Sequence, residues 1–163
     1  MMNKRRELIE LIHKSGAIEG SYIKISRLLR DPNAYSLILN HILDEVSNLG
    51  FNKVGGIEYG GIPWASMLAY KLSKGLFYVK RLLRGEEEVV VGQLYPGEGV
   101  IIIDDVISRG DFTLNILSRL KTNYGIKIIK VIFILDREEG GLEKLKSKGF
   151  NAVALINLSD LNV

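Results

Sequence analysis

Apolar positions along the chain form two kinds of pattern, and the two kinds alternate. Runs of apolar residues, many of them β-branched, predict strands, and the run at 100–103, which has no polar alternation, is typical of a strand covered on both faces of a parallel sheet. Such runs occur at residues 53–57, 76–79, 89–91, 100–103, 128–135 and 152–156, and a shorter strand is predicted at 22–25. Apolar residues three and four positions apart predict amphipathic helices at 8–16, 32–49, 63–72, 112–123 and 141–148. This alternation predicts an α/β fold with a mainly parallel sheet and helices on both of its faces.

The long helix near the middle of the first half has recognisable start and stop signals. Asp31 and Pro32 are suited to the N-cap and first helical positions, and Gly50 follows the last apolar residue, Leu49. We therefore expect this helix to span residues 32–49.

Composition is that of one globular domain over residues 1–163. Apolar residues make up 47% and charged residues 25% of the chain, as in proteins that bury a sizeable core. The formal net charge is only +3 and the cations are dispersed, so charge gives no reason to expect a nucleic-acid partner. Cysteine is absent, and acidic residues interrupt the basic start before any signal-like apolar segment forms. No apolar run reaches membrane-spanning length, so we expect a cytoplasmic protein with no membrane partner.

The most specific pattern is an apolar strand followed at once by two acids, a small-residue turn and a helix. The run at 100–103 leads into Asp104 and Asp105 and then to Gly110, after which a helix is predicted near Asp111. Free backbone N–H groups and the positive end of a helix attract an anion at such a turn. Because side chains alternate across a strand, we expect at most one of the two acids to point directly at a ligand. The pattern predicts a site for a sugar phosphate.

Three sequence motifs occur between residues 50 and 156. They read GGIEYGGIP at 55–63, IIDDVISRG at 102–110 and ILDREEGG at 134–141. The second resembles the phosphoribosyl pyrophosphate motif of type I phosphoribosyltransferases. The first and third resemble the pyrophosphate-loop region and the orotate-side segment of orotate phosphoribosyltransferases.

The resemblance implies a type I phosphoribosyltransferase fold, with a mainly parallel twisted sheet flanked by helices and a short N-terminal hood. The activity it implies is transfer of ribose 5-phosphate from phosphoribosyl pyrophosphate to orotate, giving orotidine 5′-monophosphate and pyrophosphate in pyrimidine nucleotide biosynthesis. It also implies Mg²⁺ as cofactor and a homodimer. Because hydrated Mg²⁺ needs few protein ligands, we expect the substrate to hold it, with water bridges to Asp104 or Asp105 and no direct metal ligand.

The resemblance also assigns roles to residues. Arg137 is expected to bind the carboxylate of orotate, with Ser108 as a second orotate contact. Catalytic roles are implied for Asp104 and Asp105 beneath the ribose and for Arg81 and Arg84 at the departing pyrophosphate. The residues implied to bind phosphoribosyl pyrophosphate are Tyr59, Gly60, Gly61, Lys80, Arg81, Arg84, Asp104, Asp105, Val106, Ile107, Ser108, Arg109, Gly110, Asp111 and Phe112.

Each assignment has a structural alternative. Residues 60–63 are also compatible with a simple turn before a helix, and Arg137 with an ion pair to Glu138 or Glu139. We interpret Trp64 as a core residue rather than a stacking platform.

Residues 80–88 (KRLLRGEEE) correspond to the family's mobile catalytic loop, but with a changed composition. Lys80, Arg81 and Arg84 match its cationic positions, whereas Glu86 stands where the family has histidine. Three adjacent glutamates repel pyrophosphate unless they bind metal or point away. A catalytic loop and a charged solvent-facing turn are both compatible with this stretch.

Two further segments depart from the family. Asp111 and Phe112 stand where glycine or hydroxyl residues are usual, and a carboxylate there opposes a phosphate, although it could cap the helix. In the N-terminal third, the segment that usually carries a serine-glycine turn and aromatic base contacts is largely missing. Four residues are alternative substitutes for it: Lys14, Ser15, Tyr22 and Lys24.

Two functions from different classes follow. The motifs containing Asp104, Asp105 and Arg137 favour an active transferase, for orotate or for another base. Asp111, Phe112 and the glutamate-rich loop favour a catalytically impaired relative that serves as a nucleotide-sensing or regulatory module.

Overall fold

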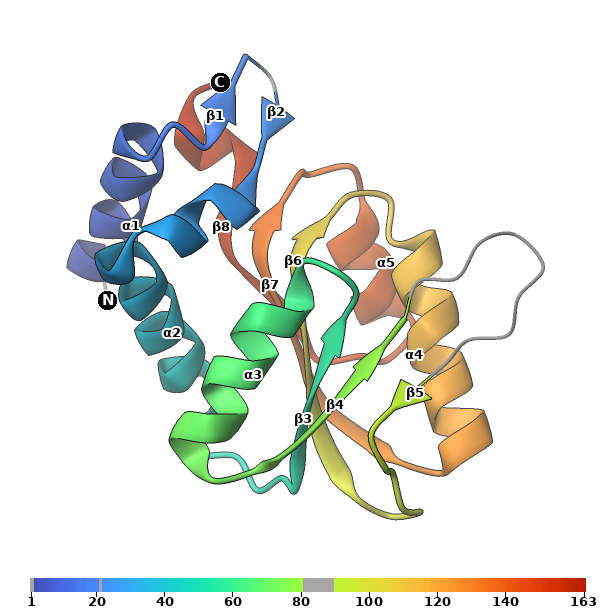
Figure 1. Ribbon diagram of the computed structural model, residues 1–163. Coiled ribbons are helices and arrows are strands. Elements are labelled where there is room, and N and C mark those ends of the chain that lie inside the picture. The colour runs from blue at the N-terminus through green and yellow to red at the C-terminus, as the bar shows by residue number, and fades with distance from the viewer. Residues whose placement is uncertain (1, 21, 81–89) are drawn as a thin grey trace.

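Six strands form one twisted sheet in a computed structural model that describes residues 2–20, 22–80 and 90–163 (Figure 1). Their order across the sheet is β5-β4-β3-β6-β7-β8. Neighbouring strands are parallel except for the antiparallel pair β4 and β5, so the predicted mainly parallel sheet is confirmed. The strands are β3 (Lys53–Ile57), β4 (Gly75–Val79), β5 (Val90–Val91), β6 (Gly99–Ile107), β7 (Lys127–Asp136) and β8 (Ala152–Asn157).

Helices cover both faces of the sheet (Figure 1). The helices on one side are α1 (Met2–Lys14), α2 (Pro32–Val46) and α3 (Gly61–Leu72), and those on the other are α4 (Asp111–Tyr124) and α5 (Gly141–Ser147). Strand β6 separates two cores: Ile101 and Ile103 belong to the core with α1 to α3, and Val100 and Ile102 to the core with α4 and α5. Burial on both faces explains why this run contains no polar residue.

A small hood joins the first core (Figure 1). It consists of α1, the hairpin β1 (Ile18–Glu19) and β2 (Tyr22–Ile23), and the 3₁₀ helix η1 (Ile25–Arg30). A second 3₁₀ helix, η2 (Leu158–Leu161), follows β8 and contacts α1. The predicted strand at 22–25 is therefore shorter than expected, and neither 3₁₀ helix was predicted because such short elements have no apolar period to recognise.

The strand β6 continues to Ile107, four residues beyond the predicted apolar run. Its parallel pairing with β7 persists at Asp104, opposite Phe133, and at Ile107, opposite Asp136. Backbone pairing does not depend on side-chain polarity, so the ladder extends through the acids as far as β7 provides a partner. Asp104 and Asp105 therefore lie within the strand rather than after it, and the turn before α4 is reduced to residues 108–110.

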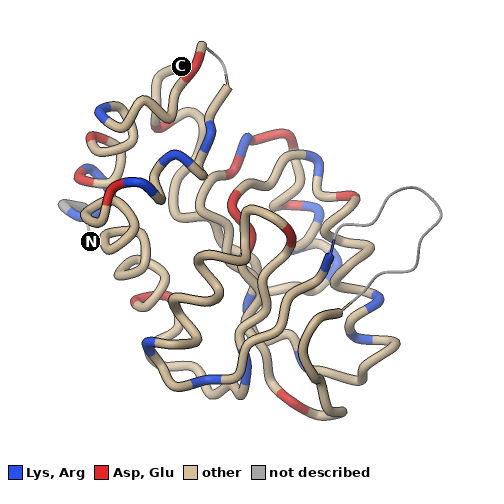
Figure 2. The backbone as a smooth tube through the Cα atoms, in the orientation of Figure 1, with Lys and Arg blue, Asp and Glu red and all other residues tan. Residues whose placement is uncertain are grey.

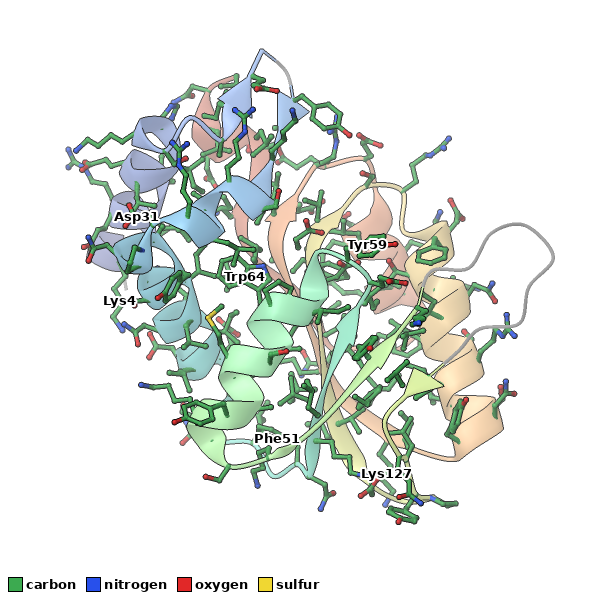
Figure 3. All side chains as sticks on the ribbon, in the orientation of Figure 1. Lys4, Asp31, Phe51, Tyr59, Trp64 and Lys127 are labelled. Carbon is green, nitrogen blue, oxygen red and sulfur yellow. The ribbon has the colours of Figure 1, made fainter. Side chains whose placement is uncertain are left out.

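Helix α2 and Trp64 were also predicted from the sequence. The side chain of Asp31 accepts a hydrogen bond from the Asn33 N–H at 2.9 Å, which confirms the predicted cap. Helix α2 ends at Val46, three residues before Leu49. Trp64 is fully buried between α3 and the hood, as the core interpretation requires (Figure 3). Within the described ranges, no helix combines the length and apolar character needed to cross a membrane.

Strand β3 tolerates its neighbour β4 only because Gly55 has no side chain. A Cβ at Gly55 would lie 2.3 Å from Cζ of Phe77, whose side chain is buried. We expect Gly55→Ala to lower the free energy of unfolding by about 1–3 kcal/mol through overpacking. Gly50→Ala, at an exposed site with open space around it, is the matched control and should change it by less than about 0.5 kcal/mol.

Urea unfolding of a double-mutant cycle tests the cause. Phe77→Leu alone also destabilises, but it removes the ring that a Cβ at position 55 would strike, so the double variant should be more stable than the sum of the single effects predicts. Additive effects would contradict this explanation.

Candidate active site

The sheet has a topological switch point between β3 and β6. From β3 the chain passes through α3 to β4 on one side, and from β6 it passes through α4 to β7 on the other, with the two helices on opposite faces (Figure 1). Ligands of open α/β sheets bind at the carboxyl ends of the strands where the order reverses in this way. Two adjoining cavities lie at these ends.

The larger one, here the central cavity, has a volume of about 430 Å³. Its wall comes from the hood, from the residues after β3, from the end of β6 and from the residue after β7. The lining residues are Tyr22, Ile23, Lys24, Ile25, Ser26, Glu58, Tyr59, Gly60, Asp104, Asp105, Val106, Ser108 and Arg137.

The smaller one, here the turn cavity, has a volume of about 270 Å³ and lies at the start of α4. It shares Asp104, Val106 and Ser108 with the central cavity, and Arg109 to Thr113 complete its lining. The acids and the turn predicted from sequence are therefore brought together around one connected space.

The two acids of β6 differ in their surroundings, although both border the central cavity. Asp104 is buried, and its Oδ1 accepts a hydrogen bond from the Asp105 N–H at 2.9 Å. The Asp105 carboxyl group lies against Gly60, where a Cβ would come within 2.0 Å of Asp105 Cγ. A Cβ at Gly61 would likewise lie 2.1 Å from the Ile103 carbonyl oxygen. The two glycines thus let the segment after β3 approach the acids.

The turn after β6 and the loop of residues 137–140 after β7 are bound to each other through their backbones. The Arg137 N–H donates to the Ile107 carbonyl and the Gly141 N–H donates to the Ser108 carbonyl, both at 2.9 Å. A Cβ at Gly141 would lie 2.3 Å from the Ser108 oxygen, and one at Gly110 would lie 2.9 Å from Gly141 Cα. Glycines on both sides therefore permit the close contact between the two segments.

Asp111 does not cap α4, although the sequence allowed it that role. Gly110, with φ of +75°, is the N-cap residue, and Asp111 is the first helical residue. The exposed Asp111 carboxylate forms an ion pair with Lys144 of α5 at 2.8 Å, and the Lys144 hydrogen bond lowers the pKa of Asp111 below its ordinary value. The nearby ammonium group therefore offsets part of the negative charge that would oppose a phosphate.

The sequence allowed two interpretations of Arg137, a ligand-binding residue and a partner in an ion pair. The structure is compatible with both. Its Nε donates to Glu139 Oε1 at 2.8 Å, and its Cζ lies 5.7 Å from the centre of the Tyr22 ring. It also borders the central cavity. Among the residues that the structure describes, its side-chain hydrogen bond uses Nε alone, so Nη1 and Nη2 remain donors for a ligand. Acidic and basic residues follow one another along this loop and the start of α4 (Figure 2).

The hood distinguishes among the four candidate substitutes for the missing segment. Tyr22 and Lys24 border the central cavity, whereas Lys14 and Ser15 border a separate cavity beside α1. Lys24 Nζ forms an ion pair with Glu19 at 2.8 Å, and Arg27 contacts the same carboxylate. Hydrogen bonds from these two cations lower the pKa of Glu19. The structure therefore favours Tyr22 and Lys24.

The remaining predicted residues fall into three groups. Arg81, Arg84 and Glu86 lie outside the described residues, and Lys80 is exposed directly after β4. The backbone at Gly61 and Ile107 lies beside the site, but these buried residues line neither cavity. Tyr59 is 79% exposed at the start of α3, at the mouth of the central cavity (Figure 3).

Four residues that line the central cavity were not predicted, Ile23, Ile25, Ser26 and Glu58, and neither was Thr113 in the turn cavity. Glu58 adjoins Tyr59 within the GGIEYGGIP motif, which is a signal that could have identified it. The three hood residues are brought to the cavity by β2 and η1, which are too short to recognise from sequence. Among described residues, no group of three or more His, Cys, Asp or Glu side chains could hold a metal ion.

These features define a type I phosphoribosyltransferase: a sheet with its switch point between β3 and β6, two acids in β6, and a small-residue turn leading into a helix. The phosphoribosyl transferase domain family matches residues 25–157.

Two relatives and one solved structure indicate which kind of phosphoribosyltransferase the chain resembles. The chain is 30% identical to the orotate phosphoribosyltransferase of Pyrococcus abyssi, over 96% of this chain and 94% of the relative. It is 31% identical to that of Thermoplasma volcanium, over 93% and 90% of the two chains. A crystal structure of orotate phosphoribosyltransferase from Aeropyrum pernix superposes with a TM-score of 0.82 at 32% identity, covering 94% of this chain and 95% of that one. The chain belongs to the phosphoribosyltransferase family, in its orotate phosphoribosyltransferase branch.

Proposed function

We propose that the protein transfers ribose 5-phosphate from phosphoribosyl pyrophosphate to orotate, giving orotidine 5′-monophosphate and pyrophosphate in pyrimidine nucleotide biosynthesis. One observation carries the proposal: the acids Asp104 and Asp105 and the cation Arg137 border the same cavity, next to the turn that begins at Ser108. The names of the relatives in Pyrococcus abyssi and Thermoplasma volcanium support orotate as the base.

In this reaction the bond from C1 of the ribose to pyrophosphate breaks, and a bond from C1 to a ring nitrogen of orotate forms. The ribose gains cationic character on the way, so negative groups beneath it stabilise the transition state. Asp104 and Asp105 supply these groups. Backbone N–H groups at residues 108–112 bind the 5-phosphate at the start of α4.

Two anionic groups of the reacting molecules need cations: the carboxylate of orotate and the departing pyrophosphate. Nη1 and Nη2 of Arg137 form a planar pair of donors that matches the carboxylate of orotate, and Ser108 lies on the same cavity. The departing pyrophosphate contacts the backbone at Tyr59, Gly60 and Gly61, with Lys80, Arg81 and Arg84 as the cations that offset its charge.

The proposal includes further properties that the family resemblance implies. Mg²⁺ would be held mainly by oxygens of phosphoribosyl pyrophosphate, and Asp104 or Asp105 could bind one of its waters. This division fits a cavity wall whose three acids, Glu58, Asp104 and Asp105, form no group among the described residues that could hold a metal ion by itself. A homodimer, a cytoplasmic location and a single domain over residues 1–163 complete the proposal.

Orotate-dependent release of pyrophosphate in the presence of Mg²⁺ is the test of this function. We expect turnover by the unaltered protein, and a loss of at least about 100-fold in kcat for Asp105→Asn because an amide cannot stabilise the cationic ribose. Asp44→Asn, at an exposed acid of α2 paired with Lys4, is the matched control and should retain full activity. Thermal unfolding should show that both variants fold.

If the unaltered protein releases no pyrophosphate yet binds orotidine 5′-monophosphate by calorimetry, the transferase proposal fails and the nucleotide-sensing alternative remains.

Base recognition by the hood gives a second prediction. Lys24 adds a cation to the cavity wall, so Lys24→Met should raise KM for orotate about five-fold, with KM for phosphoribosyl pyrophosphate changed little. Lys14→Met removes an equivalent charge from the separate cavity beside α1 and should leave both KM values unchanged. Equal effects of the two substitutions on orotate would show that Lys24 acts through general charge rather than by contact.

A further inference from the structure

Glu138 has a backbone conformation and a contact that substrate binding does not explain. Its φ is +58°, in the left-handed region that residues other than glycine rarely adopt. Its carboxylate accepts two hydrogen bonds from Ser159, one from the backbone N–H at 2.7 Å and one from Oγ at 2.9 Å. Glu138 therefore joins the 137–140 loop to η2, a segment that lies outside the central cavity.

The helix η2 is fixed independently of this contact. Leu161 is fully buried in the core that includes the hood. The Asp160 carboxylate accepts hydrogen bonds from the Asn157 N–H, at 2.7 Å, and from Arg5 of α1, and the Asn157 side chain accepts from the backbone of Asp160 in return. A reciprocal cap of this kind fixes the geometry of a short helical turn. Ser159 is thus part of a rigid support rather than a free end.

The backbone of the 137–140 loop is held at both of its ends. On the side toward β7, the Arg137 N–H donates to the Ile107 carbonyl, and Asp136 Oδ1 accepts from the Glu138 N–H at 2.9 Å. On the side toward α5, Gly140 with φ of +86° precedes the helix. Between the Arg137–Ile107 and Gly141–Ser108 backbone bonds, the side chain of Glu138 adds an attachment of the exposed part of the loop to η2.

We propose that Glu138 is a positioning residue for Arg137, acting through its two hydrogen bonds to Ser159. The contact holds the loop against η2 and so keeps the Arg137 guanidinium at the wall of the central cavity, where its Nη atoms meet the base. Glu138 itself touches no substrate. The effect on orotate rests on the proposed function, whereas the attachment of the loop does not.

A purely electrostatic role for Glu138 makes a different prediction. Substitution of Glu143 distinguishes that role from the attachment to Ser159. Glu138 and Glu143 are both exposed, and both border a cavity of about 500 Å³ behind the loop. If the negative charge that Glu138 adds to this cavity is what matters, neutralising either residue should have a similar effect. If the attachment matters, only changes at Glu138 or Ser159 should have one.

Steady-state kinetics of four variants tests the proposal. Glu138→Gly keeps the left-handed conformation accessible but removes the carboxylate, and it should raise KM for orotate about ten-fold while kcat and KM for phosphoribosyl pyrophosphate stay within about two-fold. Ser159→Ala keeps the N–H donor, and Glu138→Gln keeps one acceptor oxygen, so both should have smaller effects in the same direction. Glu143→Gln should behave as the unaltered protein. An unchanged KM for orotate in Glu138→Gly, or an equal rise in Glu143→Gln, overturns the proposal.

Hydrogen exchange gives a readout that does not need turnover. The Gly141 N–H is bonded to the Ser108 carbonyl, and its exchange should accelerate about ten-fold in Glu138→Gly but not in Glu143→Gln. If the unaltered protein does not use orotate, the proposed function fails while this measurement still tests the attachment. Equal exchange in Glu138→Gly and the unaltered protein would overturn it.

Discussion

The direct backbone contact between the turn after β6 and the loop after β7 is the constraint on which the site depends. Two hydrogen bonds, from Arg137 to Ile107 and from Gly141 to Ser108, hold these segments together. They can approach this closely because glycine stands at 110 and 141. The turn carries the helix start suited to a phosphate and the loop carries the arginine suited to a carboxylate. Under the proposed function, their contact therefore sets the distance between the groups that bind the two ends of the nucleotide.

Four sets of contacts in the surrounding elements support this backbone contact. Parallel pairing of β6 with β7 aligns the two strand ends, and the Asp111–Lys144 ion pair joins the helices that follow them. The hood brings Tyr22 to Arg137, and η2 holds Glu138. Tyr22, Lys144 and Ser159 lie outside the three motifs, and Asp111 departs from the family's pattern. Tyr22 of the shortened hood and the unusual Asp111 thus each take part in a contact that supports this part of the site.

Local signals explain how much of the fold could be predicted from the sequence. The apolar run of β6, the cap at Asp31 and the buried Trp64 each depend on neighbouring residues or on periodicity, and each was predicted correctly. The extension of β6 through Asp104 and Asp105 depends on its backbone pairing with β7, whose register no local pattern reveals. The partner of Asp111 is likewise remote, since Lys144 lies 33 residues away in the sequence. The motifs, the pairing of Arg137 with a neighbouring glutamate and the hood residues Tyr22 and Lys24 were therefore predictable. The Asp111–Lys144 pair and the hood residues Ile23, Ile25 and Ser26 were not.

Binding of ribose 5-phosphate to a Gly141→Ala variant tests the central constraint most directly. Gly141 belongs to the base side of the site, yet an added Cβ would lie 2.3 Å from the Ser108 oxygen in the turn on the phosphate side. If the two segments act as one unit, calorimetry should show that the variant, although folded, binds ribose 5-phosphate at least about ten-fold more weakly than the unaltered protein. An unchanged affinity for ribose 5-phosphate would contradict the account, because it would mean that the turn holds its shape independently of the loop.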